Sequence, residues 1–407
     1  MGKEKFPDKM NILFLSRWWP FPPDNGSRMR VFQLLKALSV DNAVNLVSLY
    51  ESDQSNRLNQ HQFCVEAHAF PYQPFKPARI QSLPGYFSKT PRSFVDTKSE
   101  DLFKKVVQLV KQNHYDLVIF SQVDMLAYRS AVSDSPCILE ELEIGTYLDG
   151  IKAKKGLRRL RLQFTLKKLA AFLREESKTL IGISVVSDKE KKQISEEVQP
   201  VCEVIVVENG VDVEGNRGFI NSKPLEPFSI VFAGAMTYSA NFEAMKYFTH
   251  HVFPLIKDRV KEASLYITGN YFGCPIEELN LCDGIHLTGY LEDVRPRIAS
   301  SQVSIAPLLT GGGTRLKILE SLSLGTPVIS TDKGAEGLDI LPGDGVIIAK
   351  NNAEFCNAVC DVLMNKDLRV ELTNRGLAAV SERYSWEKTL MPFKKLPLEI
   401  GRKSNGN

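Results

Sequence analysis

Residues 307–331 read PLLTGGGTRLKILESLSLGTPVIST, the most informative stretch of the sequence. The apolar run ending at Leu308 or Leu309 predicts a buried strand, the three glycines predict a tight turn, and 315–324 has helical period. A helix that begins directly after a strand and a glycine turn offers unpaired backbone N–H groups and a partial positive charge. The stretch therefore predicts an α/β unit with an anion site at the end of a strand.

Charged residues follow the glycine run. Arg315 and Lys317 place two cations in the first turn of the predicted helix, and a guanidinium fork beside an ammonium suits a diphosphate. Glu320 follows about a turn and a half after Arg315, where its carboxylate can accept two hydrogen bonds from a vicinal diol. Phosphate and diol side by side describe the ribose diphosphate of a nucleotide. The alternative is a flexible loop with a solvated helix start, in which Glu320 is a surface residue.

Short apolar runs alternate with helical stretches along the whole chain, which predicts an α/β fold with parallel sheets. In the first half the predicted strands are 11–16, 43–49, 115–120, 137–141, 180–186 and 203–207, and the helices 27–39, 98–112, 157–178 and 188–197. In the second half the predicted strands are 229–235, 263–269, 284–289, 303–308, 327–331 and 345–349, and the helices 240–256, 293–300, 315–324, 353–364 and 367–384.

The alternation of predicted strands and helices is interrupted at 209–228, where glycine, asparagine and proline cluster. We expect two domains, 1–208 and 229–385, with 209–228 as their linker. A C-terminal helix or tail, 386–407, is expected to pack back toward the first domain. Residues 71–97 contain five prolines and predict a long loop that could serve as a flap.

Composition excludes several classes of protein. The chain has 407 residues, 43% hydrophobic and 24% charged, as globular proteins do. The net charge of +3 is too small to indicate a nucleic-acid binder, and no apolar run approaches the roughly 20 residues of a membrane span. Seven cysteines without a CxxC pair, and a start without the apolar core of a signal peptide, predict a cytoplasmic location.

Several stretches, in their order and spacing, resemble one family. VIVVENGVDVE (204–214), IVFAGAMTYSANFEAMKYFTHHVFPLI (230–256), IHLTGYLEDV (285–294) and 312–331 are similar to the group 1 (family 4) nucleotide-sugar glycosyltransferases. The resemblance implies the GT-B fold, an α/β architecture of two Rossmann-like domains whose parallel sheets face an inter-domain cleft. It also implies transfer of a sugar, with retention, from a nucleoside diphosphate sugar to a glycan or lipid-linked glycan, as in cell-surface polysaccharide or glycoconjugate synthesis. No cofactor and no metal are implied, because no DxD triad appears and the six histidines lack ligand spacing.

By the same resemblance, Glu320 matches the second of two glutamates that flank the donor and would hold the ribose hydroxyls. The first of these glutamates falls on Gly312, which is a departure from the family pattern. Further donor contacts are implied for Gly313 and Thr314, which would replace it, and for Gly234, Tyr290, Leu291, Asn25 and Gly26.

The family also uses an arginine and a lysine in the first helix of the second domain, where this chain has Met236 and Asn241. We therefore expect Arg315 and Lys317 to take over that charge and to act as the catalytic residues, stabilising the departing diphosphate.

No histidine stands where several relatives have a catalytic one. The stretch CILEELEIGTY (137–147) instead offers Glu140, Glu141 and Glu143 at the end of a strand. One of them could orient the acceptor or stabilise the cationic transition state, or all three could be ordinary helix-start acids.

Three smaller features have two interpretations each. The resemblance implies that Gly26 faces the donor phosphates, but Asp24 or Ser27 could simply cap a helix there. Trp18 and Trp19 could line the acceptor site or cover the sheet. Cys356 and Cys360, one helical turn apart, are expected in the core rather than at a metal.

Residues 152–174 carry nine basic residues and no acidic one. Leu162, Leu166, Leu169 and Leu173 give this segment one apolar face at helical period. It could be a packed helix with a solvated basic face. It could also be a platform for anionic lipid head groups or for a lipid-diphosphate acceptor, that is, a peripheral contact at the inner face of the membrane. Nucleic acid is not expected, because only Phe164 and Phe172 are available for stacking.

Overall fold

The structure is a computed structural model that describes residues 9–23, 25–51, 58, 62–132, 135–220, 222, 224–311, 315–340 and 342–393. The chain divides into two compact units. The first comprises the described residues up to Glu208 together with Leu390–Phe393, and the second is Asn209–Thr389.

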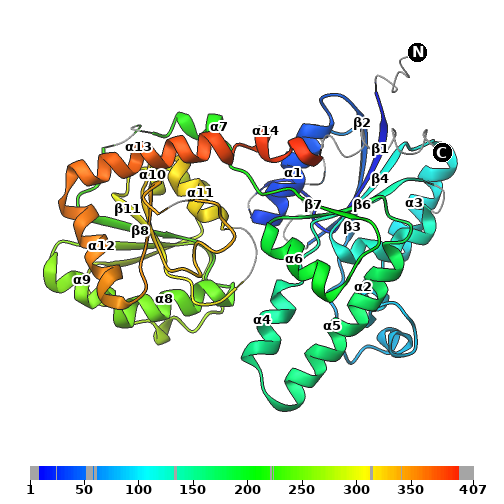
Figure 1. Cartoon of the computed structure of the whole chain (residues 1–407), viewed down its shortest axis with the longest axis horizontal. Coiled ribbons are helices and arrows are strands. Elements are labelled where there is room, and N and C mark those ends of the chain that lie inside the picture. The colour runs from blue at the N-terminus through cyan, green and yellow to red at the C-terminus, as the bar shows by residue number, and fades with distance from the viewer. Residues whose placement is uncertain are drawn as a thin grey trace. The chain divides into compact units, whose positions relative to one another are not determined.

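The first unit is built on a seven-stranded parallel sheet, in the order β3-β2-β1-β4-β5-β6-β7, with helices on its faces (Figure 1). Its strands are β1 Asn11–Ser16, β2 Ala43–Tyr50, β3 Glu66–Pro71, β4 Leu117–Ser121, β5 Cys137–Glu140, β6 Gly182–Val185 and β7 Glu203–Val206. Its helices are α1 Gly26–Leu38, η2 Ile80–Tyr86, α2 Arg92–Thr97, α3 Glu100–Gln112, η3 Val123–Ala131, α4 Gly145–Ala153, α5 Gly156–Glu176 and α6 Asp188–Glu197.

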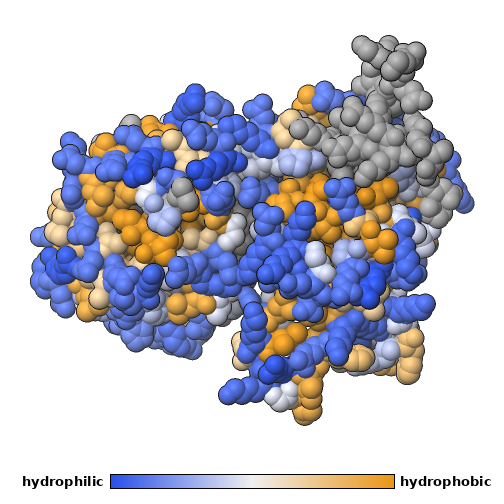
Figure 2. All heavy atoms as spheres, in the orientation of Figure 1, coloured by the Kyte–Doolittle hydropathy of each residue, from blue (hydrophilic) through white to orange (hydrophobic). Residues whose placement is uncertain are grey.

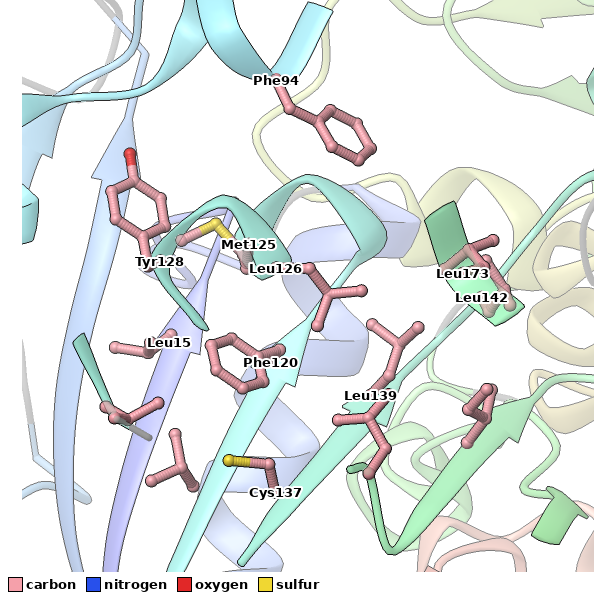
Figure 3. Close-up of a cluster of buried hydrophobic side chains, with 14 of the residues drawn as sticks. Leu15, Phe94, Phe120, Met125, Leu126, Tyr128, Cys137, Leu139, Leu142 and Leu173 are labelled. Carbon is pink, nitrogen blue, oxygen red and sulfur yellow. The ribbon is translucent and has the colours of Figure 1, made fainter. Parts of the chain in front are cut away.

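The central strands of this sheet are buried on both faces, which is why they read as continuous apolar runs. Leu15, Phe120 and Leu139, from β1, β4 and β5, lie side by side in the core (Figure 3). Met125 and Tyr128 of η3 and Leu173 of α5 contribute to the same core. Most of the predicted strands and helices of this half are confirmed within a few residues.

The segment 71–97, predicted as a loop, is partly helical. It contains η2 and α2, and the preceding strand β3 was not predicted at all. Arg92 organises the segment, because Nη2 donates a hydrogen bond to Ser82 Oγ at 2.6 Å and Nη1 donates to the Tyr86 hydroxyl at 2.5 Å. These bonds give the segment a defined conformation that proline content alone does not reveal.

The second unit has a six-stranded parallel sheet in the order β10-β9-β8-β11-β12-β13. Its strands are β8 Ser229–Ala233, β9 Ser264–Thr268, β10 Ile285–Gly289, β11 Val303–Ala306, β12 Val328–Ser330 and β13 Val346–Ile348. Its helices are α7 Val213–Arg217, α8 Ser239–His251, α9 Phe253–Arg259, η4 Ile276–Glu278, α10 Arg295–Ala299, α11 Leu316–Ser323, α12 Asn352–Met364, α13 Lys366–Arg383 and α14 Trp386–Thr389.

Two features of this unit differ from the prediction. The single helix expected over 240–256 is two helices, α8 and α9, because Pro254 in the first turn of α9 cannot continue the preceding helix. The expected linker 209–228 lies within the second unit. Its helix α7 is tied to α11 by a hydrogen bond of 2.8 Å from Asn216 Nδ2 to Ser323 Oγ. At the C-terminus, Leu390 and Phe393 are buried in the first unit, and residues 394–407 lie outside the described part of the chain.

None of the described helices combines the length and the apolar character that crossing a bilayer requires.

Candidate functional site

Three neighbouring strands of the second unit end in glycine. Gly234, Gly269 and Gly289 follow or close β8, β9 and β10, and all three have positive φ angles. A Cβ atom on Gly269 would lie 2.6 Å from the carbonyl oxygen of Gly234, so the two strand ends touch through their backbones. Without side chains there, another group can approach this edge of the sheet closely.

Lys317 reaches the end of β8 from the first turn of α11. Its Nζ donates a hydrogen bond to Asn241 Oδ1 at 2.8 Å and lies 4.1 Å from the centroid of the Phe232 ring. Asn241 is itself held, because its Nδ2 donates to the Ala235 carbonyl at 2.8 Å. A Cβ atom on Gly234 would lie only 3.0 Å from the ammonium nitrogen. The charge of Lys317 therefore stands beside the glycine at the end of β8.

The surroundings of Lys317 are unfavourable to a cation. Burial, and then the nearby charge of Arg315, lower the pKa of Lys317 to about 7. The first turn of α11 contains no acidic residue, and a cation opposes the helix dipole at an N-terminus. Among the residues that the structure describes, no carboxylate forms an ion pair with Lys317. An anion bound here would offset the repulsion from Arg315 and the unfavourable interaction with the helix dipole.

Arg315 precedes α11 as its N-cap residue, whereas the sequence predicted it inside the first turn. The side chain is buried, and its Nη2 donates hydrogen bonds to the carbonyls of Gly311 at 2.8 Å and Lys333 at 3.2 Å. Arg315 thus joins the loops after β11 and β12. Gly312, Gly313 and Thr314, predicted to contact the donor, lie outside the described residues.

Glu320 lies on the same face of α11 as Lys317, three residues further on. None of the described residues donates a hydrogen bond to its carboxylate, and burial raises its pKa, an effect that the nearby Arg295 partly offsets. Arg295 is occupied by Asp293, to which it donates two hydrogen bonds of 2.8 and 2.9 Å. Lys317 and Glu320 therefore present a cation and a carboxylate, one turn apart, that do not neutralise each other.

Arg295 and Asp293 were not predicted as site residues. Their two-residue spacing in EDVRPR (292–297) resembles many surface sequences, so it gave no signal. Tyr290, predicted near the base, is exposed directly after the edge strand β10, and Leu291 is half-buried.

In the first unit, Glu140 is already fully engaged. Its Oε1 accepts a hydrogen bond of 2.6 Å from Arg30 Nε, its Oε2 accepts one of 2.7 Å from Ser121 Oγ, and both members of the Arg30–Glu140 pair are completely buried. This carboxylate fastens α1 to the ends of β4 and β5, so it is not available to a substrate. Its selection as an acceptor residue was wrong.

Glu141 and Gln122 occupy strained positions at the ends of β5 and β4. Both have left-handed backbones, with φ of +57° and +77°, and Gln122 Nε2 donates a hydrogen bond of 2.8 Å to Glu141 Oε2. Burial, and then the charge of Glu140, raise the pKa of Glu141 to about 8. Non-glycine residues with such backbones occur preferentially at functional sites.

The remaining first-unit candidates have local partners. Asn25 Oδ1 accepts a hydrogen bond from Arg28 N at 3.0 Å and caps α1, whose first residue is Gly26, so the cap is neither Ser27 nor Asp24, which lies outside the described residues. Glu143 accepts a hydrogen bond of 3.1 Å from Thr146 at the start of α4, as the helix-start interpretation expects.

Of the two pairs of residues with alternative interpretations, Trp19, Cys356 and Cys360 are buried and Trp18 is half-buried. Trp19 is buried against Phe21, while Trp18 lies under the guanidinium of Arg17. Cys356 and Cys360 are buried in the core with their sulfurs 4.0 Å apart. Within the described ranges, no three His, Cys, Asp or Glu side chains converge in a way that could hold a metal ion.

Two parallel sheets with these topologies define the class of protein, a GT-B fold. Solved structures agree along almost the whole chain. Sucrose-phosphate synthase from Thermosynechococcus elongatus has a TM-score of 0.66 at 15% identity, with 97% of this chain and 98% of that chain covered. HepE of Anabaena in complex with UDP-glucose has a TM-score of 0.64 at 14% identity, with 98% and 100% covered. WaaG, a glycosyltransferase involved in lipopolysaccharide biosynthesis, has a TM-score of 0.62 at 13% identity, with 97% and 100% covered. At these identities the likeness establishes the fold.

A family model matches most of the second unit. Residues 227–365, which lie within the second unit, match the family model described as Glycosyl transferases group 1, in agreement with the resemblance seen in the sequence. Among curated proteins, an uncharacterized 44.6 kDa protein in the cps region of Klebsiella pneumoniae is 22% identical over 168 residues. That alignment spans 39% of this chain and 43% of the relative.

Proposed function

We propose that the protein transfers a sugar, with retention and without a metal ion, from a nucleoside diphosphate sugar to a hydroxyl of a glycan or lipid-linked glycan. The observation that carries this proposal is the placement of Lys317. A buried cation at a helix N-terminus, with no carboxylate partner among the described residues, costs stability unless an anion binds it.

The donor diphosphate is the anion that the site would take. Its charge would restore the proton on Lys317, and the ammonium would then stabilise the negative charge that grows on the leaving diphosphate. One such preorganised contact contributes about 10²-fold or more to turnover. The positive charge of Arg315 would also attract the diphosphate, while its side chain positions the loop after β11. In a retaining reaction of this kind, the leaving phosphate itself can accept the proton of the acceptor hydroxyl.

Glu320 would hold the ribose. Its carboxylate is free of hydrogen bonds from the described residues and can accept two from the ribose hydroxyls, one turn along α11 from the phosphate contact. Gly234 at the end of β8 would give the diphosphate room next to Lys317.

On the acceptor side we assign the role to Glu141 rather than Glu140. With its pKa raised to about 8, Glu141 is mostly protonated at neutral pH, so it can donate a hydrogen bond to an acceptor oxygen while Gln122 fixes its orientation. Glu140 would act only through packing, by supporting the strand end that carries Glu141.

The solved relatives support the choice of first ligand and acceptor class. HepE binds UDP and UDP-glucose, and WaaG is involved in lipopolysaccharide biosynthesis. UDP is therefore the first nucleotide to test, with a lipid-linked glycan as acceptor at the cytoplasmic face of a membrane.

One observation favours a second candidate function. Gly312 stands where the family has its first glutamate, so the chain could bind a nucleotide sugar without transferring it, or process the donor without an acceptor, as an epimerase does.

The test begins with a thermal-shift screen against UDP, GDP, ADP and their sugars, because a ligand that binds the native state raises Tm. We then expect donor consumption in the presence of chelator and release of a product whose anomeric configuration matches the donor. Binding without donor consumption would support the inactive alternative, and an altered nucleotide sugar formed without acceptor would support the epimerase-like one. No Tm shift with any nucleotide would overturn the proposal.

A further inference from the structure

Helix α5 has a second apolar face that points away from the core. Leu166, Leu169 and Leu173 are buried as predicted, but Leu157, Leu160 and Phe164 are exposed, Leu157 to 84%. These three residues are spaced three and four apart, so they form one stripe on the outer side of the helix. Large exposed apolar side chains that share one face indicate a surface that another body covers.

Cations flank this stripe. Arg161 and Lys168 lie on one side of it at helical spacing, and Lys167 lies on the other. None of the nine basic residues of 152–174 forms an ion pair with a carboxylate in the part of the chain that the structure describes. Their charges are therefore available to an external anionic partner.

A second apolar segment lies beside the helix. Ile80 and Phe87, at the two ends of residues 80–87, are 80% and 95% exposed, and Leu83 and Tyr86 between them are also exposed. Lys168 Nζ donates a hydrogen bond to the carbonyl of Gly85, which joins the segment to α5. Phe94 and Phe172, whose ring centroids are 5.8 Å apart, pack the following helix α2 on the same side of α5.

The segment is held in this exposed conformation. A Cβ atom on Gly85 would lie 2.6 Å from Arg92 Cα, so the turn packs directly on α2. Arg92 also lies 4.2 Å from the centroid of the Tyr86 ring. Helices α4 and α5 project from the first unit at the bottom of the view (Figure 1), and hydrophobic residues lie there among hydrophilic ones (Figure 2).

We propose that α5 and residues 80–87 form a docking surface for an anionic lipid bilayer. Charge complementarity selects this partner, because 152–174 carries nine cations and no acidic residue, and Arg161, Lys167 and Lys168 flank apolar side chains that can enter the boundary between head groups and acyl chains. Each cation near an anionic surface contributes binding energy, and the apolar stripe adds burial that nucleic acid would not supply. This inference does not depend on the proposed transfer reaction.

The test is sedimentation of the full chain with vesicles of phosphatidylcholine alone and of phosphatidylcholine with phosphatidylglycerol. We expect binding to the anionic vesicles only, and weaker binding as ionic strength rises from about 0.1 M to about 1 M, which shortens the Debye length from about 10 Å to about 3 Å. The variant R161Q/K167Q should bind about 30-fold more weakly, since each cation contributes about 1 kcal/mol. The variant L160S/F164S should lose about 10-fold or more.

The matched control is K104Q/K111Q on α3, which removes the same charge from another helix of the first unit and should leave vesicle binding unchanged. Thermal melting shows whether each variant is folded. Equal loss in R161Q/K167Q and K104Q/K111Q, absence of binding to anionic vesicles, or tight binding to single-stranded RNA in preference to vesicles would each overturn the proposal.

Discussion

Nucleotide binding should be linked to proton uptake by Lys317. In the free protein the pKa of Lys317 is about 7, so the ammonium is largely deprotonated at pH 8. A bound diphosphate should return the pKa toward the ordinary value of about 10.4. Binding of UDP should therefore take up about 0.9 proton at pH 8, and its dissociation constant should rise about 50-fold from pH 7 to pH 9.

Isothermal titration calorimetry in two buffers with different ionisation enthalpies measures this uptake directly. Lys317→Gln is the control, because it replaces the titrating amine with a neutral polar group and leaves the titration of UDP itself unchanged. The variant should bind UDP more weakly at pH 7, and the difference should shrink by pH 9. Equal proton uptake by the wild type and Lys317→Gln at pH 8 would refute the assignment of Lys317 to the diphosphate.

The same pKa sets the pH dependence of stability. Between about pH 7 and about pH 10.4 the unfolded chain keeps a proton on Lys317 that the free folded protein has released. The cost of burying this lysine is thus greatest below pH 7 and falls as the pH rises. Relative to Lys317→Gln, the unliganded wild type should gain stability from pH 7 to pH 9.

Three further substitutions separate structural from functional roles. Arg30→Leu should lower the free energy of unfolding by about 3–5 kcal/mol in denaturant, because it leaves Glu140 buried without its partner. The double variant Arg30→Leu/Glu140→Leu should recover most of this stability. A loss below about 1 kcal/mol in the single variant would contradict the buried pair. Gly234→Ala should weaken UDP binding, because its methyl group would meet Lys317 Nζ and Asn241 Nδ2. Gly269→Ala should chiefly lower Tm, because its methyl group would meet the backbone of Gly234. The opposite pattern would argue against a ligand at the end of β8. Glu141→Gln keeps the hydrogen-bonding capacity of a neutral acid, so transfer should persist at neutral pH and lose its decline above about pH 8; an unchanged pH profile would exclude Glu141.

Most of the fold could be predicted because the central strands are buried on both faces and stand out as apolar runs. The edge strand β3, with the sequence EAHAFP, is half-buried and polar, so it has no such signal. The helix break before α9 was readable from Pro254 and was overlooked. The outer stripe of α5 was missed because apolar residues on two opposite faces blur the helical period.

The candidate site was predictable where it depends on neighbours along the chain. Lys317 and Glu320 share one short helix, so their spacing predicts their common face. The contact of Lys317 with Asn241 joins residues 76 positions apart, and Arg30 meets Glu140 across 110 positions. No local pattern reports such pairs, and for this reason Glu140 was mistaken for an available acid.

A crystal structure of the complex with UDP would show whether Lys317 and Glu320 hold the nucleotide. We predict the diphosphate within hydrogen-bonding distance of Lys317 Nζ, beside Gly234, and the two ribose hydroxyls on the carboxylate of Glu320. A nucleotide bound elsewhere, or a ribose that leaves Glu320 without a contact, would contradict the assignment of Lys317 and Glu320 to the donor.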